Sequence, residues 1–97
     1  MRYEIILAVE AVEDLKLLKA SIRTELRQAL ETHLRYEPRK VSRRRIKRLR
    51  GLRHPQYRLR LGEIRVLYDV SASTVEILAI VAKLEAESWL AEFGIPE

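Results

Sequence analysis

The side chains most able to do chemistry in this sequence are basic residues concentrated in one segment. From Arg39 to Arg60 every charged residue is Lys or Arg, eleven in all, whereas the whole chain of 97 residues has a net charge of +5. So many like charges repel one another and lower the stability of a fold unless an anion offsets them. The segment predicts a cationic surface that binds a polyanion such as RNA; the alternative is a solvated run of charges without a partner.

The segment divides into two parts with different expected tasks. Residues 39–53 are expected to hold an RNA backbone without sequence preference. The basic residues predicted to bind RNA there are Arg43, Arg44, Arg45, Lys47, Arg48, Arg50 and Arg53. His54 follows and is also placed in the RNA-binding set, because histidine is the usual acid or base near neutral pH. The alternative is a surface loop histidine without a role.

The second part of the segment leads into a predicted β-hairpin. The pair Gly62-Glu63 is typical of a two-residue loop, with glycine at the first position of a type II′ turn. The flanking strands are predicted at Tyr57–Leu61 and Ile64–Val70. Counting outward from the loop places Arg60 opposite Arg65, so the sequence predicts a complete register for this hairpin.

Alternation of side chains gives this hairpin one apolar face and one basic face. The apolar face is predicted to hold Tyr57, Leu59, Leu61, Ile64, Val66 and Tyr68. Arg58, Arg60 and Arg65 share the other face, with neighbouring Cβ atoms about 5–7 Å apart. Such a cluster predicts a phosphate site, because the planar guanidinium binds phosphate through two hydrogen bonds. The alternative is that each arginine pairs with an acid, for example Asp69, Glu76 or Glu85, or extends over the rim of the sheet into solvent.

The elements that must position these residues predict an α+β fold. An N-terminal strand is expected at Tyr3–Val9, then an antiparallel helical hairpin whose helices run around Ala11–Leu18 and from Ser21, as N-cap, to Leu34. The strands Tyr57–Leu61, Ile64–Val70 and Thr74–Val81 are expected to form a three-stranded antiparallel meander. A short C-terminal helix at Leu84–Phe93 is expected to close the chain. His33 falls on the second helix and is expected to pack near its end.

Size and composition limit the class of protein. With 97 residues and 47% hydrophobic content, the chain can build one core, so residues 1–97 are expected to form a single domain. The lack of cysteine excludes disulfides and thiolate zinc sites and fits a reducing compartment. The N-terminal apolar run is too short for a signal peptide or a membrane span. We expect a cytoplasmic protein without a membrane association, a metal site or a cofactor.

Two motifs resemble the central signature of the RelE/ParE toxin superfamily. The first is Leu49-Arg50-Gly51, a Leu-x-Gly element. The second is the stretch from Tyr57 to Tyr68, which reads Tyr-Arg-Leu-Arg-Leu-Gly-Glu-Ile-Arg-Val-Leu-Tyr. The helix pair and the final strand also match the family layout, so the resemblance covers nearly the whole chain. It implies a RelE-like fold and a toxin of a type II toxin–antitoxin system, preferably of the RelE-like mRNA interferase branch.

Activity and partners follow from this resemblance as expectations. It implies a ribosome-dependent mRNA endonuclease that inhibits translation and uses no metal. By motif position, the expected catalytic residues are Arg58, Arg60, Arg65 and Lys83. Trp89 falls near a C-terminal tyrosine of the family and is expected to stack on an RNA base. The implied partners are the ribosome, mRNA and a cognate RelB-like antitoxin with an acidic, partly disordered segment.

The proton chemistry departs from the pattern of RelE-like enzymes. Attack of a ribose 2′-hydroxyl on the adjacent phosphate requires charge stabilisation, removal of one proton and donation of another. Arginine stabilises charge but is a poor base, because its pKa is above about 12. Trp89 does not titrate, which leaves Lys83 as the only motif position able to transfer a proton. This departure favours two alternatives: a ParE-like DNA gyrase inhibitor and a non-catalytic basic RNA-binding module.

Overall fold

Five strands form one mixed sheet in the computed structural model, which describes all residues 1–97, in the order β1-β6-β5-β4-β2. These strands are β1 (Glu4–Leu7), β2 (Ile46–Arg48), β4 (Tyr57–Leu61), β5 (Ile64–Val70) and β6 (Thr74–Ala82). β1 runs parallel to β6, and the other neighbours are antiparallel. A second sheet of two strands joins β3 (Leu52–His54) to β7 (Ile95–Pro96). The predicted meander is therefore the centre of a larger sheet.

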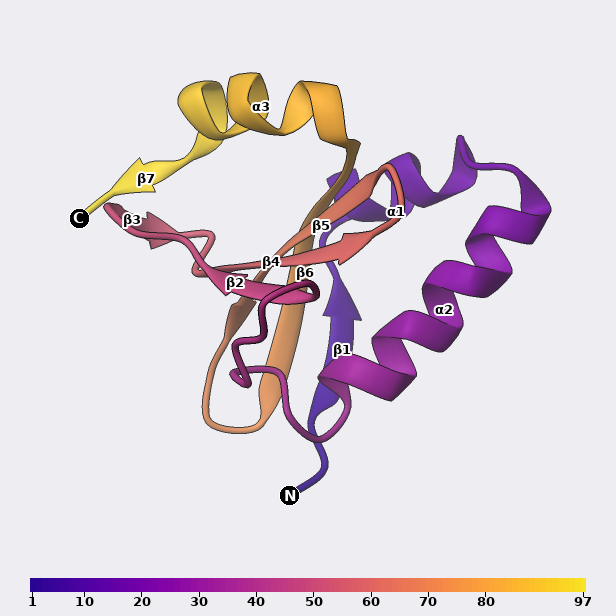
Figure 1. The fold of residues 1–97 in the computed structure, drawn as a ribbon, viewed down its shortest axis with the longest axis horizontal. Helices are drawn as coiled ribbons and strands as arrows, with labels where there is room; N and C mark the ends of the chain where they lie inside the picture. Colours follow the sequence, from indigo (N-terminus) through magenta and orange to yellow (C-terminus); the bar gives the residue numbers. More distant parts are fainter.

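Helices lie on both sides of this sheet (Figure 1). The helical elements are α1 (Val9–Lys16), α2 (Ala20–Leu34), the short 3-10 helix η1 (Lys83–Glu85) and α3 (Ala86–Phe93). α1 and α2 cover one side, whereas α3 and β7 lie toward the other (Figure 1). None of these helices combines the length and the apolar character needed to cross a bilayer. The α+β prediction is confirmed.

The start of α2 differs from the prediction. The helix begins at Ala20, and its N-cap is Lys19, which has an extended backbone and makes no side-chain cap hydrogen bond. The prediction that Ser21 is the N-cap is therefore wrong, because Ser21 already lies in the first turn. The preceding link is correspondingly short, since α1 ends at Lys16.

The predicted hairpin register is confirmed at every pair. Tyr57 lies opposite Tyr68, Arg60 opposite Arg65, and the intervening residues pair as the two-residue loop requires. Gly62 has φ +56, the left-handed value that a type II′ turn needs at its first central position. The apolar and basic faces of the hairpin therefore separate as predicted.

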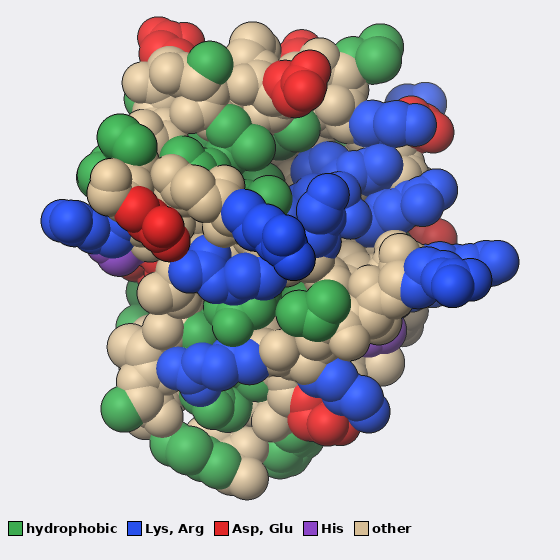
Figure 2. Space-filling model, turned by 60° about the vertical axis from the view of Figure 1, so that its left-hand side comes forward, with side chains coloured by type: hydrophobic (Ala, Val, Ile, Leu, Met, Phe, Trp, Pro, Cys, Tyr) green, Lys and Arg blue, Asp and Glu red, His purple; other side chains and the backbone are tan.

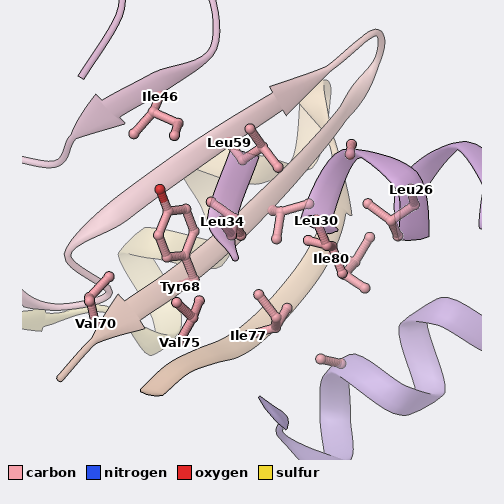
Figure 3. Close-up of a cluster of buried hydrophobic side chains, with 13 residues drawn as sticks. Leu26, Leu30, Leu34, Ile46, Leu59, Tyr68, Val70, Val75, Ile77 and Ile80 are labelled. Atoms are coloured by element: carbon pink, nitrogen blue, oxygen red, sulfur yellow. The ribbon is translucent and has the colours of Figure 1, made fainter. Parts of the chain in front are cut away.

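The core lies between α2 and the apolar face of the sheet. Leu26, Leu30 and Leu34 of α2 point toward the strands, where Leu59 and Tyr68 meet them (Figure 3). Burial of each such leucine contributes about 1.5–3 kcal/mol. This packing fixes the orientation of β4 and β5 and therefore of the arginines on their opposite face.

Tyr68 is buried on the apolar face of the hairpin, where the sequence predicted it. Its hydroxyl donates a hydrogen bond to the Pro38 carbonyl at 2.7 Å, and its ring stacks on Tyr57 with the centroids 5.5 Å apart. Burial raises the pKa of the Tyr68 hydroxyl above its usual range, and Tyr57 acts in the same direction. The neutral hydroxyl thus links the strand to the chain that follows α2.

β6 contains a register shift that affects the face of the sheet opposite the core. Leu67 pairs with Ala79 and Tyr68 with Ile77, so Leu78 is an extra residue in the strand. The N–H of Ile80 donates to Oδ2 of Asp14 in α1 at 2.9 Å. Leu78 then lines a cleft on the α3 side of the sheet.

Candidate RNA-binding and catalytic site

Basic side chains from three adjacent strands share the face of the sheet opposite α2. Arg60 and Arg65 are directly paired between β4 and β5, and Arg58 lies one step along β4 on the same face. Lys47 of β2 lies opposite Arg58 and adds a fourth cation. The sequence did not predict this pair, because a three-residue basic strand has no recognisable periodicity. We call Lys47, Arg58, Arg60 and Arg65 the cationic face.

No carboxylate neutralises the cationic face. Among the eleven basic residues of the segment 39–60, only Lys40 is ion-paired, with Glu37 at 3.6 Å. The alternative in which Asp69, Glu76 or Glu85 pairs with the hairpin arginines is therefore wrong. Figure 2 shows Lys and Arg side chains gathered in a broad band on one face of the molecule. These unpaired charges are suited to binding an external anion.

Arg58 shows the electrostatic cost of this arrangement most clearly. Burial lowers the pKa of its guanidinium, and the charges of Arg65 and Arg60 act in the same direction. Its Nε is buried and has no hydrogen-bond partner. A buried donor without a partner costs about 1–3 kcal/mol. An anion placed against Arg58 would remove both penalties.

Arg65 can act on the site through its positive charge, although little of its side chain is exposed. It is 5% exposed, and its Nη1 donates to the carbonyls of Gly62 at 2.7 Å and Ile64 at 3.0 Å. These bonds fix the guanidinium at the hairpin loop. The expected phosphate site therefore consists of exposed Arg60 and half-buried Arg58, with Arg65 as a fixed charge behind them.

A second group of arginines extends the cationic face toward the hairpin loop. Arg44, Arg45, Arg60 and Gly62 line a recess of about 350 Å³ that has no hydrophobic lining residue. The backbone joins the two chain segments here, since the Arg60 N–H donates to the Arg45 carbonyl at 2.8 Å. The recess brings part of the predicted RNA-binding segment next to the predicted catalytic strand.

The remaining predicted RNA-binding residues differ in exposure. Arg43, Lys47, Arg50 and Arg53 are exposed. Arg48 instead turns inward: its Nη1 donates to the carbonyls of Leu49 at 2.7 Å and Gln56 at 2.8 Å, and its guanidinium lies over the Tyr57 ring. Arg48 is therefore engaged in holding the loop before β4.

Lys83 lies beside the hairpin loop. It is exposed at the start of η1, and its backbone N–H donates to the Glu63 carbonyl at 2.7 Å. This bond brings the last predicted catalytic residue to the same end of the sheet as Arg60 and Arg65. The four predicted catalytic residues are thus gathered around one hairpin.

A cleft of about 450 Å³ lies between α3 and the sheet, next to the cationic face. It is lined by Ala8, Glu10, His54, Pro55, Asp69, Glu76, Leu78, Trp89, Phe93 and Ile95. Trp89 and Phe93 are in contact, with ring centroids 5.3 Å apart. We call this space the α3 cleft, and it places Trp89 and His54, both predicted from the sequence, in one lining.

His54 is held by an acid that the sequence analysis did not connect with it. Its Nδ1 lies 2.7 Å from Oδ2 of Asp69, while Oδ1 of Asp69 accepts the Gln56 N–H at 2.8 Å. One further pair beyond Tyr57 and Tyr68 in the hairpin register would have placed Gln56 opposite Asp69. Extending the register in this way would have shown that Asp69 lies next to the short loop that follows His54. No group of three or more His, Cys, Asp or Glu side chains in the structure could hold a metal ion.

His33 lies in contrasting surroundings. It is half-buried near the end of α2, as predicted, and shares a small recess with Arg45, Lys40 and Glu37. Burial lowers the pKa of the His33 imidazole, and the charge of Arg45 acts in the same direction. Both effects favour the neutral form of this histidine.

Comparisons with known proteins bear on the fold. No protein-family model matches the chain, and no curated protein matches its sequence. Three solved structures illustrate the similarity. A chain of the RelBE2 toxin–antitoxin complex of Mycobacterium tuberculosis is 26% identical to this chain, with a TM-score of 0.68. The match covers 84% of this chain and 99% of that chain. A chain of the RelE–RelB complex of Pyrococcus horikoshii is 28% identical to this chain, with a TM-score of 0.63. The match covers 86% of this chain and 97% of that chain.

A free toxin gives the same result without a bound partner. A mutant of Escherichia coli toxin RelE in the free state, with two arginines replaced by alanine, is 23% identical with a TM-score of 0.73. The match covers 95% of this chain and 94% of that toxin. The fold of this chain is thus similar to that of RelE toxins, which supports a place in the RelE/ParE-like toxin superfamily.

Proposed function

We propose that this protein is the toxin of a type II toxin–antitoxin pair and cuts mRNA on the ribosome. The observation that carries the proposal is the cationic face, in which Arg58, Arg60 and Arg65 adjoin one another without a carboxylate partner. A fold accepts such repulsion where an anionic ligand offsets it. The superfamily fold and a phosphate-sized cationic site together favour an endoribonuclease.

The cationic face would act by stabilising charge in the transition state. When the 2′-oxygen attacks the phosphorus, negative charge grows on the non-bridging phosphate oxygens. Arg58 and Arg60 would donate hydrogen bonds to those oxygens, and Arg65 would add a fixed positive charge. Arg58 is already partly desolvated, so its interaction with the phosphate is stronger than it would be in water.

Other residues would place the RNA. Arg43, Arg44 and Arg45, which precede β2, would contact neighbouring phosphates without reading the sequence. Trp89 in the α3 cleft would stack on a base and so fix the nucleotide next to the scissile phosphate. Lys83, beside the hairpin loop, would contribute a further charge close to the reacting group.

The same cationic face suits a cognate antitoxin. An acidic segment that folds on binding would neutralise the unpaired arginines and block RNA at the same time. Several of the similar structures are themselves complexes of RelB with RelE. The proposed antitoxin is therefore RelB-like, with an acidic, partly disordered segment, and co-purification of the two gene products would test it.

The function is tested with purified protein on translating ribosomes. We expect mRNA cleavage within the ribosome, mapped by primer extension, and its loss in Arg58→Met. Arg27→Met is the matched control, because Arg27 is exposed on α2 away from the cationic face. Intact mRNA with inhibited gyrase supercoiling would establish the ParE-like alternative. Intact mRNA with RNA retention alone would indicate a binding module.

A further inference from the structure

The cationic face consists of three arginines and Lys47, and the α3 cleft next to it contains a histidine, the usual base near neutral pH. We infer that His54, oriented by Asp69, is the general base that removes the proton from the attacking ribose 2′-hydroxyl. This inference rests on the proposed endoribonuclease function and assigns a further catalytic residue to it.

The hydrogen bonds of Asp69 determine which nitrogen of His54 is available. Oδ2 of Asp69 lies 2.7 Å from Nδ1 of His54, and an ionised carboxylate accepts but does not donate. Nδ1 therefore carries the hydrogen, and Nε2 keeps a free lone pair. The backbone N–H of Gln56 donates to Oδ1 at 2.8 Å and fixes the carboxylate. The imidazole is thus held in the tautomer that a general base requires.

The hairpin register places this pair of residues beside the phosphate site. Arg58 lies opposite Leu67 on β4 and β5, and Asp69 is two residues along β5 on the same face. Such diagonal neighbours have Cβ atoms about 7–8 Å apart. His54, bonded to Asp69, therefore borders the end of the cationic face at which Arg58 lies. A nucleotide could reach both with its phosphate and its ribose.

The surroundings of His54 differ in charge from the cationic face. The charged side chains that line the cleft with it are Glu10 of α1, Asp69 of β5 and Glu76 of β6. All three are acids, whereas a base placed among the arginines would be surrounded by positive charge that opposes proton uptake. The fold therefore separates this histidine from the guanidinium groups that would hold the phosphate.

The proposed step balances without any change of oxidation state. Nε2 of His54 takes the proton of the 2′-hydroxyl, and the 2′-oxygen forms a bond to the adjacent phosphorus. The bond from phosphorus to the 5′-oxygen breaks, and that oxygen leaves with the bonding electron pair and takes a proton from water. The products are a 2′,3′-cyclic phosphate and a 5′-hydroxyl end. The imidazolium then returns its proton to solvent.

A purely structural task is the competing explanation. Asp69 binds both His54 and Gln56 and so also holds the loop before β4 in place. His54→Asn separates the two roles, because the asparagine amide can still donate to Asp69 but has no basic nitrogen. His33→Asn is the matched control, since it makes the same chemical change in the other histidine.

The experiment measures single-turnover mRNA cleavage on ribosomes for wild type, His54→Asn and His33→Asn. We expect His54→Asn to be slower by about 100-fold or more, the typical contribution of a general base. The acid limb of the pH–rate profile should disappear in this variant, and added imidazole should restore part of the rate. Binding of a 2′-O-methyl mRNA that cannot be cut should be unchanged, and His33→Asn should cleave like wild type.

Each other outcome overturns the inference at an identifiable level. If wild type does not cleave, the proposed function fails and the base assignment fails with it. If wild type cleaves and His54→Asn does so within about threefold, the function stands and the base assignment is wrong. A slow His54→Asn that keeps the acid limb and shows no imidazole rescue would leave His54 as a loop clamp only.

Discussion

The cationic face and the α3 cleft lie side by side on one sheet, yet their electrostatic surroundings are opposite. Arg58 is crowded by Arg60 and Arg65, and its pKa is lowered by burial and by these neighbours. In the cleft, His54 is bonded to Asp69, with further acids around it. Holding a phosphate requires accumulated positive charge, whereas accepting a proton is easier near negative charge.

The two histidines repeat this contrast. His33 lies near Arg45, where burial and positive charge lower the pKa of its imidazole. His54 lies in the α3 cleft, where the charged lining residues are acidic. Residue type alone therefore does not determine the chemistry. The neighbours supplied by the fold differ in charge, so the two histidines are not equivalent sites.

The largest effect is expected on the cationic side, from Arg58→Met. Cleavage should fall by about 100- to 1000-fold, because a preorganised donor to the phosphate is lost. The free energy of unfolding should rise by about 0.5–1 kcal/mol, since a buried donor without a partner and a like-charge repulsion disappear. Chemical denaturation and ribosome cleavage assays measure the two quantities. A variant that is less stable than wild type would contradict the strained environment assigned to Arg58.

A smaller loss is expected in the cleft from Asp69→Asn. The amide can donate to His54 and so favour the wrong tautomer, which should slow cleavage by about 10- to 100-fold. Affinity for RNA should not fall, because the change removes a negative charge. Fluorescence binding and cleavage assays on the same preparations make the comparison. Weaker RNA binding in Asp69→Asn would show that the cleft and the cationic face are not separate in function.

A modest effect is expected in the loop before β2, from the double variant Arg43→Gln/Arg44→Gln. Both arginines are exposed and lack ion-pair partners. The salt dependence of RNA binding should become shallower, by about 0.7 in the log–log slope for each phosphate of single-stranded RNA that is no longer neutralised. The cleavage rate at saturating RNA should be unchanged. An unaltered slope would mean that these arginines do not bind phosphate.

The smallest effect concerns stability at mild acid pH. The pKa of His33 is lowered in the folded state, so the unfolded chain takes up the proton first as the pH falls below about 6.5. Wild type should therefore lose stability as the pH falls through about 6.5, whereas His33→Gln should lose less. A Tm difference of about 1–2 °C is expected after solvent screening. Equal pH dependence in both proteins would contradict this environment for His33.

The sequence predicted the hairpin best, because a two-residue loop and strict alternation leave one register. All pairs from Tyr57–Tyr68 to the loop are as counted. The short strands β2, β3 and β7 were not predicted, since two or three residues do not show a period. Ser21 was a plausible N-cap by residue type, but the first helical residue is already Ala20. Local preference decides little where the link before a helix is so short.

The sequence predicted the charge of the site but not its side-chain contacts. Grouping Arg58 with Arg60 and Arg65 required only the register. That Arg65 would bond to the loop carbonyls depends on side-chain packing, which periodicity does not describe. The bond from His54 to Asp69 joins residues 15 positions apart. Extending the hairpin register places Gln56 opposite Asp69, but it does not give the path of the chain from Gln56 back through the bend at Pro55 to His54.

One parallel measurement tests the division of labour most directly: binding of uncleavable 2′-O-methyl mRNA and single-turnover cleavage of normal mRNA, compared for Arg58→Met and His54→Asn. We predict that Arg58→Met weakens both binding and cleavage. We predict that His54→Asn slows cleavage by about 100-fold while binding stays within about twofold of wild type. Parallel losses of binding and cleavage in both variants would contradict the separation of phosphate holding from proton transfer.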